Sequence, residues 1–442
     1  MRAESELLCL PPRVVGSSIE LDYVGITGAG ESTRFTETID LPGSLDDADP
    51  SAVAAVLRLL SLAASLSYFK AYAPARLVVP DGLSEQERRF IAELTANGLG
   101  EFAYVNDLPE VFSTEIVAAP VEPPAVEALA TSAPIAPRRI LVAVGGGKDS
   151  IVSIEGLKRA GFEVGLFSVN SYQPIEATAT VAGIPLLSAR RRLDPELFRL
   201  NAAGAPNGHV PVTAVNSLVA LLTAMSLGFD TVAFSNEASS SFGNVLWHGR
   251  VVNHQWSKGL EFERLLRESL PASAPDYLSL LRPLTELRIA RRFASYSDYH
   301  PVFTSCNRAF KLQASERTSW CADCPKCRFV FLCLAPFLTR EALLAIFAGR
   351  DMFADPAQRE GFLELLGEDG LLKPFECVGE PVECQVALRL LADHEDWRDQ
   401  PFLSDPRVAA LKASAADEER VFAFIEHEHF LPPTLESVAR AV

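Results

Sequence analysis

The sequence predicts an α/β protein whose central unit is a doubly wound parallel sheet. From residue 138 onward, apolar runs typical of buried strands alternate with helical stretches, as they do in such sheets. A Pro- and Ala-rich segment precedes this alternation, and a set of regularly spaced cysteines follows it. These observations divide the chain into an α+β N-terminal domain over 1–117, a linker over 118–137, a sheet domain over 138–300, and a four-cysteine knuckle with a mostly helical region over 301–442.

The composition of the chain excludes several classes of protein. With 48% hydrophobic and 22% charged residues, the 442-residue chain can bury sizeable cores and is not of a disordered type. Its net charge of −17 argues against a broad nucleic-acid surface, which needs clustered Lys and Arg. The densest basic run, Arg190–Arg192, fits either a local basic patch or the start of a solvated helix.

Targeting and redox features favour the cytoplasm. The first residues include Glu4 and Glu6 and lack the basic and apolar regions of a signal peptide. The apolar stretch 52–66 is short and contains Arg58, which predicts a buried helix rather than a membrane span. Most of the eight cysteines are clustered, which favours a reducing compartment and a metal site over a disulfide framework. We therefore expect a cytoplasmic protein with a small-molecule substrate and no nucleic-acid or membrane partner; the sequence leaves its oligomeric state open.

The N-terminal domain is expected to combine half-buried strands with two helices. Apolar and polar residues alternate as they do in such strands, and two longer stretches have a helical pattern. The expected strands cover 18–24, 33–39, 75–79 and 101–105, and the expected helices cover 51–68 and 84–97.

A glycine turn opens the sheet domain. The apolar strand 140–144 leads into Gly145–Gly147, and an amphipathic helix begins after Ser150. Glycines let the backbone approach a ligand closely, and the N–H groups at a helix start attract anions such as phosphate. Lys148 adds a positive charge, Asp149 is suited to hold Mg²⁺, and Ser150 can donate a hydrogen bond. The turn is not a Walker A loop, because Asp149 stands where that motif has Ser or Thr.

The later strands place further loops at the same edge of the sheet. Strands are expected over 162–169 and 231–235, with a third beginning at 183, and an apolar helix over 212–227. Ligands of such sheets bind beyond the carboxyl ends of the strands. The loops at Asn170 and at Asn236–Ser239 are therefore candidates for ligand contact.

A polar and aromatic stretch, Trp247–Lys258, follows the sheet pattern. Its mixture of Trp, His, Asn, Arg and Lys suits a substrate pocket that combines stacking faces with charges, although a loop with buried Trp anchors fits as well. His254 and Lys258 are its candidates for carrying a proton or binding an anion.

The cysteine set predicts a metal site. Cys321, Cys324 and Cys327 have C-x₂-C-x₂-C spacing, and Cys306 upstream supplies a fourth thiolate for tetrahedral Zn²⁺. An iron–sulfur cluster and free buried cysteines stay open as alternatives. Beyond it, the segment 373–384 either returns a carboxylate such as Glu376 or Glu383 to the site or forms a surface loop.

The glycine turn resembles the pyrophosphate loop, S-G-G-x-D-S, of the ATP pyrophosphatase superfamily, with Gly145 in place of the first Ser. An ordinary strand–helix turn is the alternative. The resemblance implies the PP-loop (HUP-like) form of the doubly wound sheet, in which ATP is cleaved between its α and β phosphates. It also implies that the adenosine lies near Asn170 and that the pyrophosphate lies on Gly145, Gly146, Gly147, Lys148, Asp149 and Ser150.

Several motifs together resemble one family, the UDP-N-acetylmuramoyl-L-alanyl-L-glutamate epimerases of peptidoglycan precursor synthesis. They are the glycine turn, H-Q-W-S-K at 254–258, C-A-D-C-P-K-C-R-F-V at 321–330 and K-P-F-E-C-V at 373–378. The resemblance covers most of the chain. It implies that ATP and Mg²⁺ adenylate the α-carboxylate of the terminal L-Glu, that the α-carbon is inverted, and that AMP and pyrophosphate are released. A structural Zn²⁺ on the four cysteines fits this reading.

Adenylation has a clear physical purpose in such a reaction. A carboxylate resists loss of its α-proton, because the new negative charge would lie beside an existing one; a mixed anhydride with AMP removes that charge. An acid and a base then act on opposite faces of the carbon. Glu237, His254 and Lys258 are the candidates for this proton transfer.

Three other functions stay open. One is a PP-loop adenylating ligase or a sulfur or nitrogen transferase, similar to the enzymes that make deazaguanine nitriles. The second is tRNA thiolation, which the acidic charge disfavours. The third is an inert ATP-binding regulatory module, which Lys148–Ser150 and the aromatic, charged stretch argue against.

Overall fold

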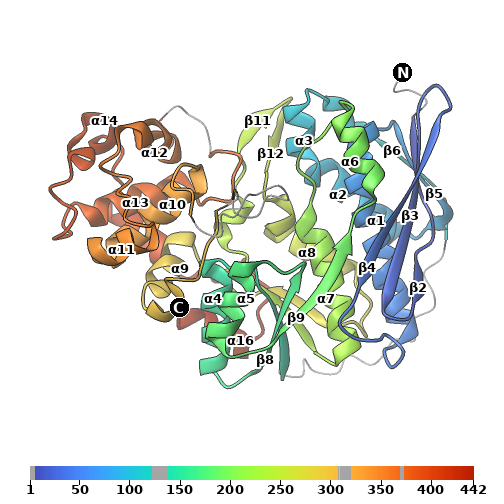
Figure 1. Cartoon of the computed structure of the whole chain (residues 1–442), viewed down its shortest axis with the longest axis horizontal. Helices are drawn as coiled ribbons and strands as arrows, with labels where there is room; N and C mark the ends of the chain where they lie inside the picture. The colour runs from blue at the N-terminus through green and yellow to red at the C-terminus, as the bar shows by residue number, and fades with distance from the viewer. Residues whose placement is uncertain (1–4, 122–137, 307, 309–319, 369–372) are drawn as a thin grey trace.

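A computed structural model of the chain describes residues 5–121, 138–306, 308, 320–368 and 373–442. Its main feature is one long sheet with helices on both faces, followed by a helical C-terminal region (Figure 1). The expected α/β class with a mostly parallel central sheet is confirmed. Most of the expected linker, 122–137, lies outside the described residues, and the strand before it extends to Pro120.

The parallel part of the sheet has the strand order of a doubly wound fold. Its five strands run in the order β13-β10-β7-β8-β9, and every neighbouring pair is parallel. Because β7 continues to β8 on one side and is flanked by β10 on the other, the order reverses between β7 and β10. The bounds are β7 Arg139–Ala143, β8 Glu163–Val169, β9 Leu186–Arg192, β10 Thr231–Phe234 and β13 Asp276–Ser279.

The central strand β7 is buried on both faces, which explains its uninterrupted apolar sequence. Ile140 and Val142 pack into the core shared with the C-terminal helices, whereas Leu141 packs into the core shared with the N-terminal region. Helices cover both faces of the parallel strands. They are α4 Lys148–Arg159, α5 Gln173–Ala182, α6 Pro195–Ala202, α7 Val212–Leu227, α8 Leu260–Ser269 and α9 Glu286–Phe293.

The N-terminal strands extend this same sheet, a connection that the sequence pattern does not reveal. β4 pairs antiparallel with β9 through Thr38–Arg192, Ile39–Arg191 and Asp40–Arg190, and the order continues β3-β1-β5-β6, with β2 on β3. The blue N-terminal strands therefore lie at one end of the long axis, and the orange C-terminal helices lie at the other end (Figure 1). The bounds are β1 Glu6–Cys9, β2 Arg13–Val15, β3 Ser18–Ile26, β4 Ser32–Asp40, β5 Arg76–Leu83 and β6 Glu115–Pro120.

Three helices complete the N-terminal region: α1 Pro50–Tyr72, α2 Glu85–Gly98 and α3 Gly100–Val105. Asp49 caps α1 by accepting a hydrogen bond from the Ser51 N–H, and Pro50 suits the first helical turn. Among the described residues, α1 alone is long and apolar enough to cross a membrane, and 83% of its apolar window is buried within the fold. The strand expected over 101–105 is wrong: the segment forms α3, because an alternation of five residues also satisfies a helix that buries Phe102 and Ala103.

The C-terminal region is helical, as expected. Its helices are α10 Pro325–Leu334, α11 Arg340–Ile346, α12 Arg359–Leu365, α13 Pro381–Leu391, α14 Pro406–Ala409, α15 Ala415–Phe422 and α16 Pro433–Arg440. The last of them returns to pack on α4 of the sheet domain. The polar stretch after β10 forms a hairpin of β11 Val245–Trp247 and β12 Arg250–Val252.

The basic run Arg190–Arg192 lies in β9, so the expected helix start is wrong. Arg191 is buried and makes a bidentate ion pair with Glu37 on β4, with nitrogen–oxygen distances of 2.6 and 3.2 Å, and Arg192 pairs with Asp40. Two of the three arginines therefore join the N-terminal strands to the parallel sheet.

We expect Glu37→Ala to destabilise the protein by about 3–5 kcal/mol, because it leaves the Arg191 guanidinium buried without its carboxylate. Urea unfolding followed by circular dichroism measures the change. The matched control is Glu196→Ala, which removes the partner of exposed Arg199 and should cost less than about 1 kcal/mol. Equal losses in the two variants would contradict a joining role for the buried pair.

Candidate active site

The glycine turn lies at the switch point of the sheet, where α/β proteins bind ligands. It connects the carboxyl end of β7 to α4. Gly146 has φ +77°, a conformation that favours glycine, and a Cβ on Gly147 would meet the Ser305 hydroxyl at 2.7 Å. A Cβ on Gly145 would meet nothing within 4 Å, so this residue faces open space. No side chain of the described residues caps the N-terminus of α4, which leaves its first N–H groups to a ligand or solvent.

Directly after the turn, a buried carboxylate holds two lysines. Lys148 is fully buried and pairs with both Asp149 and Glu286, the first residue of α9. Lys326 of α10 contributes the second ammonium, 3.3 Å from Glu286. Burial opposes ionisation of Glu286, but the two lysines prevail and lower its pKa to about 2. Lys148, expected as a charge for phosphate, is therefore already neutralised by protein carboxylates.

Glu237 follows β10 at the same edge of the sheet. It is 4% exposed, and its Oε1 has no hydrogen-bond partner among the described residues. Burial raises the pKa of Glu237 to about 7, helped by the nearby charges of Glu286 and Asp149. Such a carboxyl can exchange a proton near neutral pH, which general acid–base catalysis requires.

Lys258 and His254 meet a cysteine that sequence patterns did not single out. The Lys258 ammonium lies 3.2 Å from the sulfur of Cys377, and His254 bonds both this sulfur and Glu101. Burial raises the pKa of Cys377, but Lys258 and His254 outweigh it and lower the pKa to about 5. Cys377 and Glu101 raise the pKa of His254 to about 9 against the effect of burial. The group therefore consists of a thiolate held between two cations.

One buried arginine positions the two loops that carry Glu237 and Lys258. Arg282 pairs with Glu263 at 2.9 Å and donates to the backbone carbonyls of Glu237 and Lys258. Because these carbonyls belong to different loops, the guanidinium fixes the loops relative to each other. The backbones of Glu237 and Lys258, two of the three residues expected to transfer protons, are brought together in this way.

The segment 373–384 reaches into the site and is not a surface loop. Lys373 is buried and donates to the Ser239 carbonyl and the Gln255 side chain, each at 3.1 Å. Burial lowers the pKa of Lys373 to about 8. Glu383 accepts from the Ser239 hydroxyl and from the Leu287 N–H, so its role is to attach α13 to the sheet domain.

Two residues expected at the nucleotide have structural partners. The Asn170 amide exchanges hydrogen bonds with the backbone of Arg191 at 3.0 and 3.1 Å, which ties the end of β8 to β9. The Ser150 hydroxyl donates to the Gly147 carbonyl at 3.0 Å and closes the turn. Both lie at the expected edge, but these side-chain atoms are occupied, and the Asn170 N–H donates to the Ala189 carbonyl at 2.8 Å.

Four buried cysteines form one group about the start of α10. The sulfurs of Cys306, Cys321, Cys324 and Cys327 all lie within 4.8 Å of one another, with two pairs at 3.4 and 3.6 Å. Four thiolates around a tetrahedral zinc are about 3.8 Å apart, given Zn–S bonds of about 2.3 Å. The described cysteines form no disulfide, and the group is of the right size and chemistry to hold a metal ion such as zinc.

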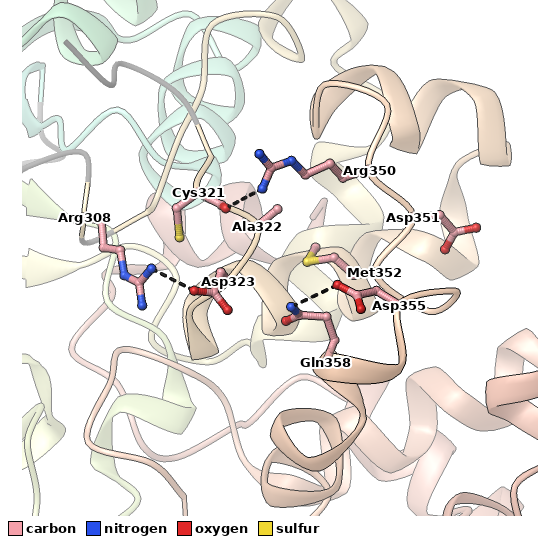
Figure 2. Close-up of a pocket in the computed structure, with 9 residues that line it drawn as sticks. All are labelled: Arg308, Cys321, Ala322, Asp323, Arg350, Asp351, Met352, Asp355 and Gln358. Carbon is pink, nitrogen blue, oxygen red and sulfur yellow. Dashed lines mark hydrogen bonds and ion pairs between the residues drawn. The ribbon is translucent and has the colours of Figure 1, made fainter. Parts of the chain in front are cut away.

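A polar pocket of about 520 Å³ lies beside the cysteine group (Figure 2). Cys321 lines it, Arg350 donates to the Cys321 carbonyl at 3.1 Å, and Arg308 pairs with Asp323. Two arginines and three aspartates line the pocket, so its net charge is negative. The pocket therefore lacks the positive charge of an anion site, and its lining does not include the ionisable residues around Glu237.

These features define an α/β protein with a buried cluster of ionisable residues at the switch point of its sheet and a separate group of four cysteines. Comparison with known families narrows the class. Residues 16–280 match the MurL N-terminal domain and residues 302–421 match the MurL C-terminal domain. The chain belongs to the MurL family, as its motifs had indicated.

Three relatives carry the same name, UDP-N-acetyl-alpha-D-muramoyl-L-alanyl-L-glutamate epimerase. The protein of Micromonospora sp. is 49% identical over 430 residues, which cover 95% of this chain and 94% of the relative. That of Salinispora tropica is 50% identical over 392 residues, covering 87% and 83%. That of Xanthomonas oryzae pv. oryzae is 40% identical over 425 residues, covering 93% and 92%. No solved structure matches the chain.

We expect the purified protein to contain one metal ion per chain, bound by the four-cysteine group. Elemental analysis by inductively coupled plasma mass spectrometry measures it. Cys327→Ser should lose the ion and lower the melting temperature, because three thiolates no longer close the tetrahedron. The matched control is Cys9→Ala. Cys9 is also buried, but it lies in β1, far in sequence from the four-cysteine group, so this variant should retain the metal. Metal-free wild-type protein prepared without chelators would contradict the site.

Proposed function

We propose that this chain is an ATP-dependent epimerase that inverts the terminal L-glutamate of UDP-MurNAc-L-Ala-L-Glu. The names of relatives 40–50% identical over most of the chain support this reaction. The structural observation that carries it is the buried Glu237 carboxyl, at the same sheet edge as the glycine turn. Its Oε1 has no hydrogen-bond partner among the described residues, and burial raises its pKa to about 7. One feature suits proton transfer and the other suits phosphate binding, which are the two requirements of the reaction.

ATP is proposed to bind at the glycine turn as in PP-loop enzymes. The open side of Gly145 and the uncapped start of α4 fit a phosphate group. Lys148 is neutralised by Glu286, so the N–H groups rather than this ammonium supply the contacts to phosphate. Asp149 keeps 25% of its side chain exposed and is the proposed ligand for Mg²⁺.

The four-cysteine group is proposed to hold a structural Zn²⁺. The distances between its sulfurs fit tetrahedral zinc, and all four cysteines are buried. Lys326 stands between two of these cysteines in sequence and bonds Glu286 in space. The group therefore fixes the start of α10 and the ammonium that α10 contributes to the site.

The chemistry follows from the charges of the site. In solution the α-proton of a glutamate residue is held because its carboxylate resists a second negative charge. Adenylation makes the acyl group neutral, so an enolate can form after loss of the proton. Glu237 is the proposed proton donor or acceptor, and the ammonium of Lys258 stabilises the enolate oxygen. Water then hydrolyses the mixed anhydride and releases AMP.

We further propose that the chain forms one enzyme. Its units are the N-terminal domain, the linker, the sheet domain and the helical region with its cysteines. The substrate is a small molecule, the compartment is the cytoplasm, and neither nucleic acid nor membrane is a partner. The net charge of −17 supports the absence of a nucleic-acid partner.

A second function is favoured by one observation. An adenylating sulfur transferase needs a reactive cysteine, and Cys377 is a half-buried thiol whose pKa Lys258 and His254 depress. Transfer of sulfur to the activated carbonyl would leave the α-hydrogen in place. Epimerisation exchanges that hydrogen with solvent, so the two reactions are distinguished by hydrogen exchange.

We expect incubation with UDP-MurNAc-L-Ala-L-Glu, ATP and Mg²⁺ in D₂O to yield AMP, pyrophosphate and the D-glutamyl product with deuterium at its α-carbon. Chiral chromatography with mass spectrometry measures the product. Omission of ATP is the control and should prevent exchange. ATP consumption without deuterium uptake would instead support the transferase, and no turnover of this dipeptide would contradict the proposed substrate.

We expect Glu237→Gln to lower the rate of inversion at least about 100-fold, the scale of general acid–base catalysis, because an amide cannot exchange the proton. Release of pyrophosphate with the same substrate should stay within about threefold of wild type. The matched control is Glu196→Gln, a carboxylate on exposed α6 that should leave both rates unchanged. Inversion near the wild-type rate in Glu237→Gln would exclude this carboxyl from the reaction.

A further inference from the structure

Cys377 is surrounded by charged side chains, and the proposed activation step gives this cysteine no role. Its sulfur lies 3.2 Å from the Lys258 ammonium and accepts a hydrogen bond from His254, which also bonds Glu101 and packs against the His209 ring. These partners come from two separate parts of the chain, α3 and the stretch after β12, and Cys377 itself lies in a third, the segment 373–378. A thiol that served only as packing would not need two cations and a carboxylate arranged around it.

We propose that Cys377 is the second proton-transfer residue of the epimerase, removing the α-proton of the activated L-glutamate from the face opposite Glu237. This inference rests on the proposed function and names the group that the inversion still lacks. Inversion of an α-carbon that is held in place requires two groups, because a single residue that takes and returns the proton on one face retains the configuration.

Lys258 connects the two proposed groups. Its ammonium touches the sulfur of Cys377, and its charge also acts on the Glu237 carboxyl. Arg282 holds the backbone carbonyls of Glu237 and Lys258 on one guanidinium. A substrate whose acyl oxygen is bound by Lys258 would thus present its α-carbon near both groups.

The charge states of the two groups are suited to the L-to-D direction. Lys258 and His254 keep Cys377 ionised, with a pKa of about 5, while burial raises the pKa of Glu237 to about 7. Between these values the thiolate accepts a proton and the carboxylic acid donates one. Environments that separate the pKa values of two groups in this way assign the base and the acid. The groups that face this pair are Lys258, His254, Lys326, Glu286, Asp149 and Lys373, and Glu101 and His209 contact His254 in turn.

The proton transfers balance without any further reactant. The bond between Cα and hydrogen breaks, the proton goes to the Cys377 sulfur, and the electron pair forms the enolate of the acyl adenylate. Glu237 then gives its carboxylic proton to Cα on the other face and becomes a carboxylate. Hydrolysis breaks the bond between the acyl carbon and the AMP oxygen. Proton exchange with water returns Cys377 to the thiolate and Glu237 to the acid.

The test compares Cys377→Ala with Glu237→Gln, both incubated with UDP-MurNAc-L-Ala-L-Glu, ATP and Mg²⁺ in D₂O. Three quantities are measured: pyrophosphate release, deuterium in recovered L-glutamyl substrate, and D-glutamyl product. We expect Cys377→Ala to lose both deuterium uptake and inversion at least about 100-fold while pyrophosphate release stays within threefold. We expect Glu237→Gln to lose inversion but to retain deuterium uptake into the L-epimer, because the thiolate still removes and returns the hydrogen.

Several outcomes would overturn the assignment. They are inversion by Cys377→Ala within tenfold of wild type, loss of its pyrophosphate release in folded protein, or loss of deuterium uptake in Glu237→Gln. A covalent thioester on Cys377, detected by intact-protein mass spectrometry after acid quenching, would make the thiolate a nucleophile instead. Cys9→Ala is the matched control and should behave as wild type. Failure of the wild-type protein to turn over the dipeptide would refute the proposed function itself.

A second measurement keeps the inference testable if Cys377→Ala does not fold. Iodoacetamide labelling of the wild-type protein, followed by peptide mass mapping, gives the pH at which Cys377 becomes reactive. We expect a midpoint near the thiolate pKa of about 5 and an upward shift of at least about one pH unit in Lys258→Met. A midpoint near the ordinary thiol pKa of about 8.5 in the wild-type protein would overturn the assignment.

Discussion

The structure depends on one buried carboxylate, Glu286, which binds Lys148 after the glycine turn and Lys326 at the start of α10. Removing charges from water is costly, so these three side chains are stable only as a set. The set joins α4, α9 and α10, which belong to the sheet domain and the helical region. A metal on the cysteine group would hold Lys326 in place, since Cys324 and Cys327 flank it. The glycine turn and the four-cysteine group look independent in the sequence, but Glu286 links them by binding a lysine next to each.

The sequence predicted the parts of the fold that leave a local pattern. The alternation of strands and helices after residue 138 and the spacing of the cysteines are signals contained within short windows. Pairing between distant strands leaves no such signal. The junction of β4 with β9 joins segments about 150 residues apart, and the buried Glu37–Arg191 pair that stabilises it looked like part of a solvated basic run. The strand predicted over 101–105 was wrong for a related reason, because a pattern of five alternating residues fits a helix as well as a strand.

In the candidate site, too, some residues were indicated by local sequence patterns and others became visible only in the folded structure. Glu237, His254 and Lys258 follow recognisable strand ends or occupy an unusual polar stretch, so the sequence singled them out. Cys377 has no spacing that marks it, and it meets Lys258 across 119 residues of chain. Glu286 and Arg282 lie in a stretch whose charges resemble those of any exposed helix. Their importance becomes visible only when burial is known, because a buried charge without a partner would be unstable.

The balance of charges in the site supports the proposed order, in which adenylation precedes the proton transfer. Before substrate binds, the carboxylates Asp149, Glu286 and Glu101 and the thiolate of Cys377 are opposed by the ammonium groups of Lys148, Lys326 and Lys258 and by the His254 imidazolium. A free substrate carboxylate would add a negative charge beside Glu237, which burial already keeps near its protonated form. An adenylated, neutral acyl group avoids that repulsion, and Lys258 then has one new negative charge to stabilise, that of the enolate. A site with this charge balance is suited to stabilise the enolate of an activated ester and unsuited to bind the dianion that a free carboxylate would form.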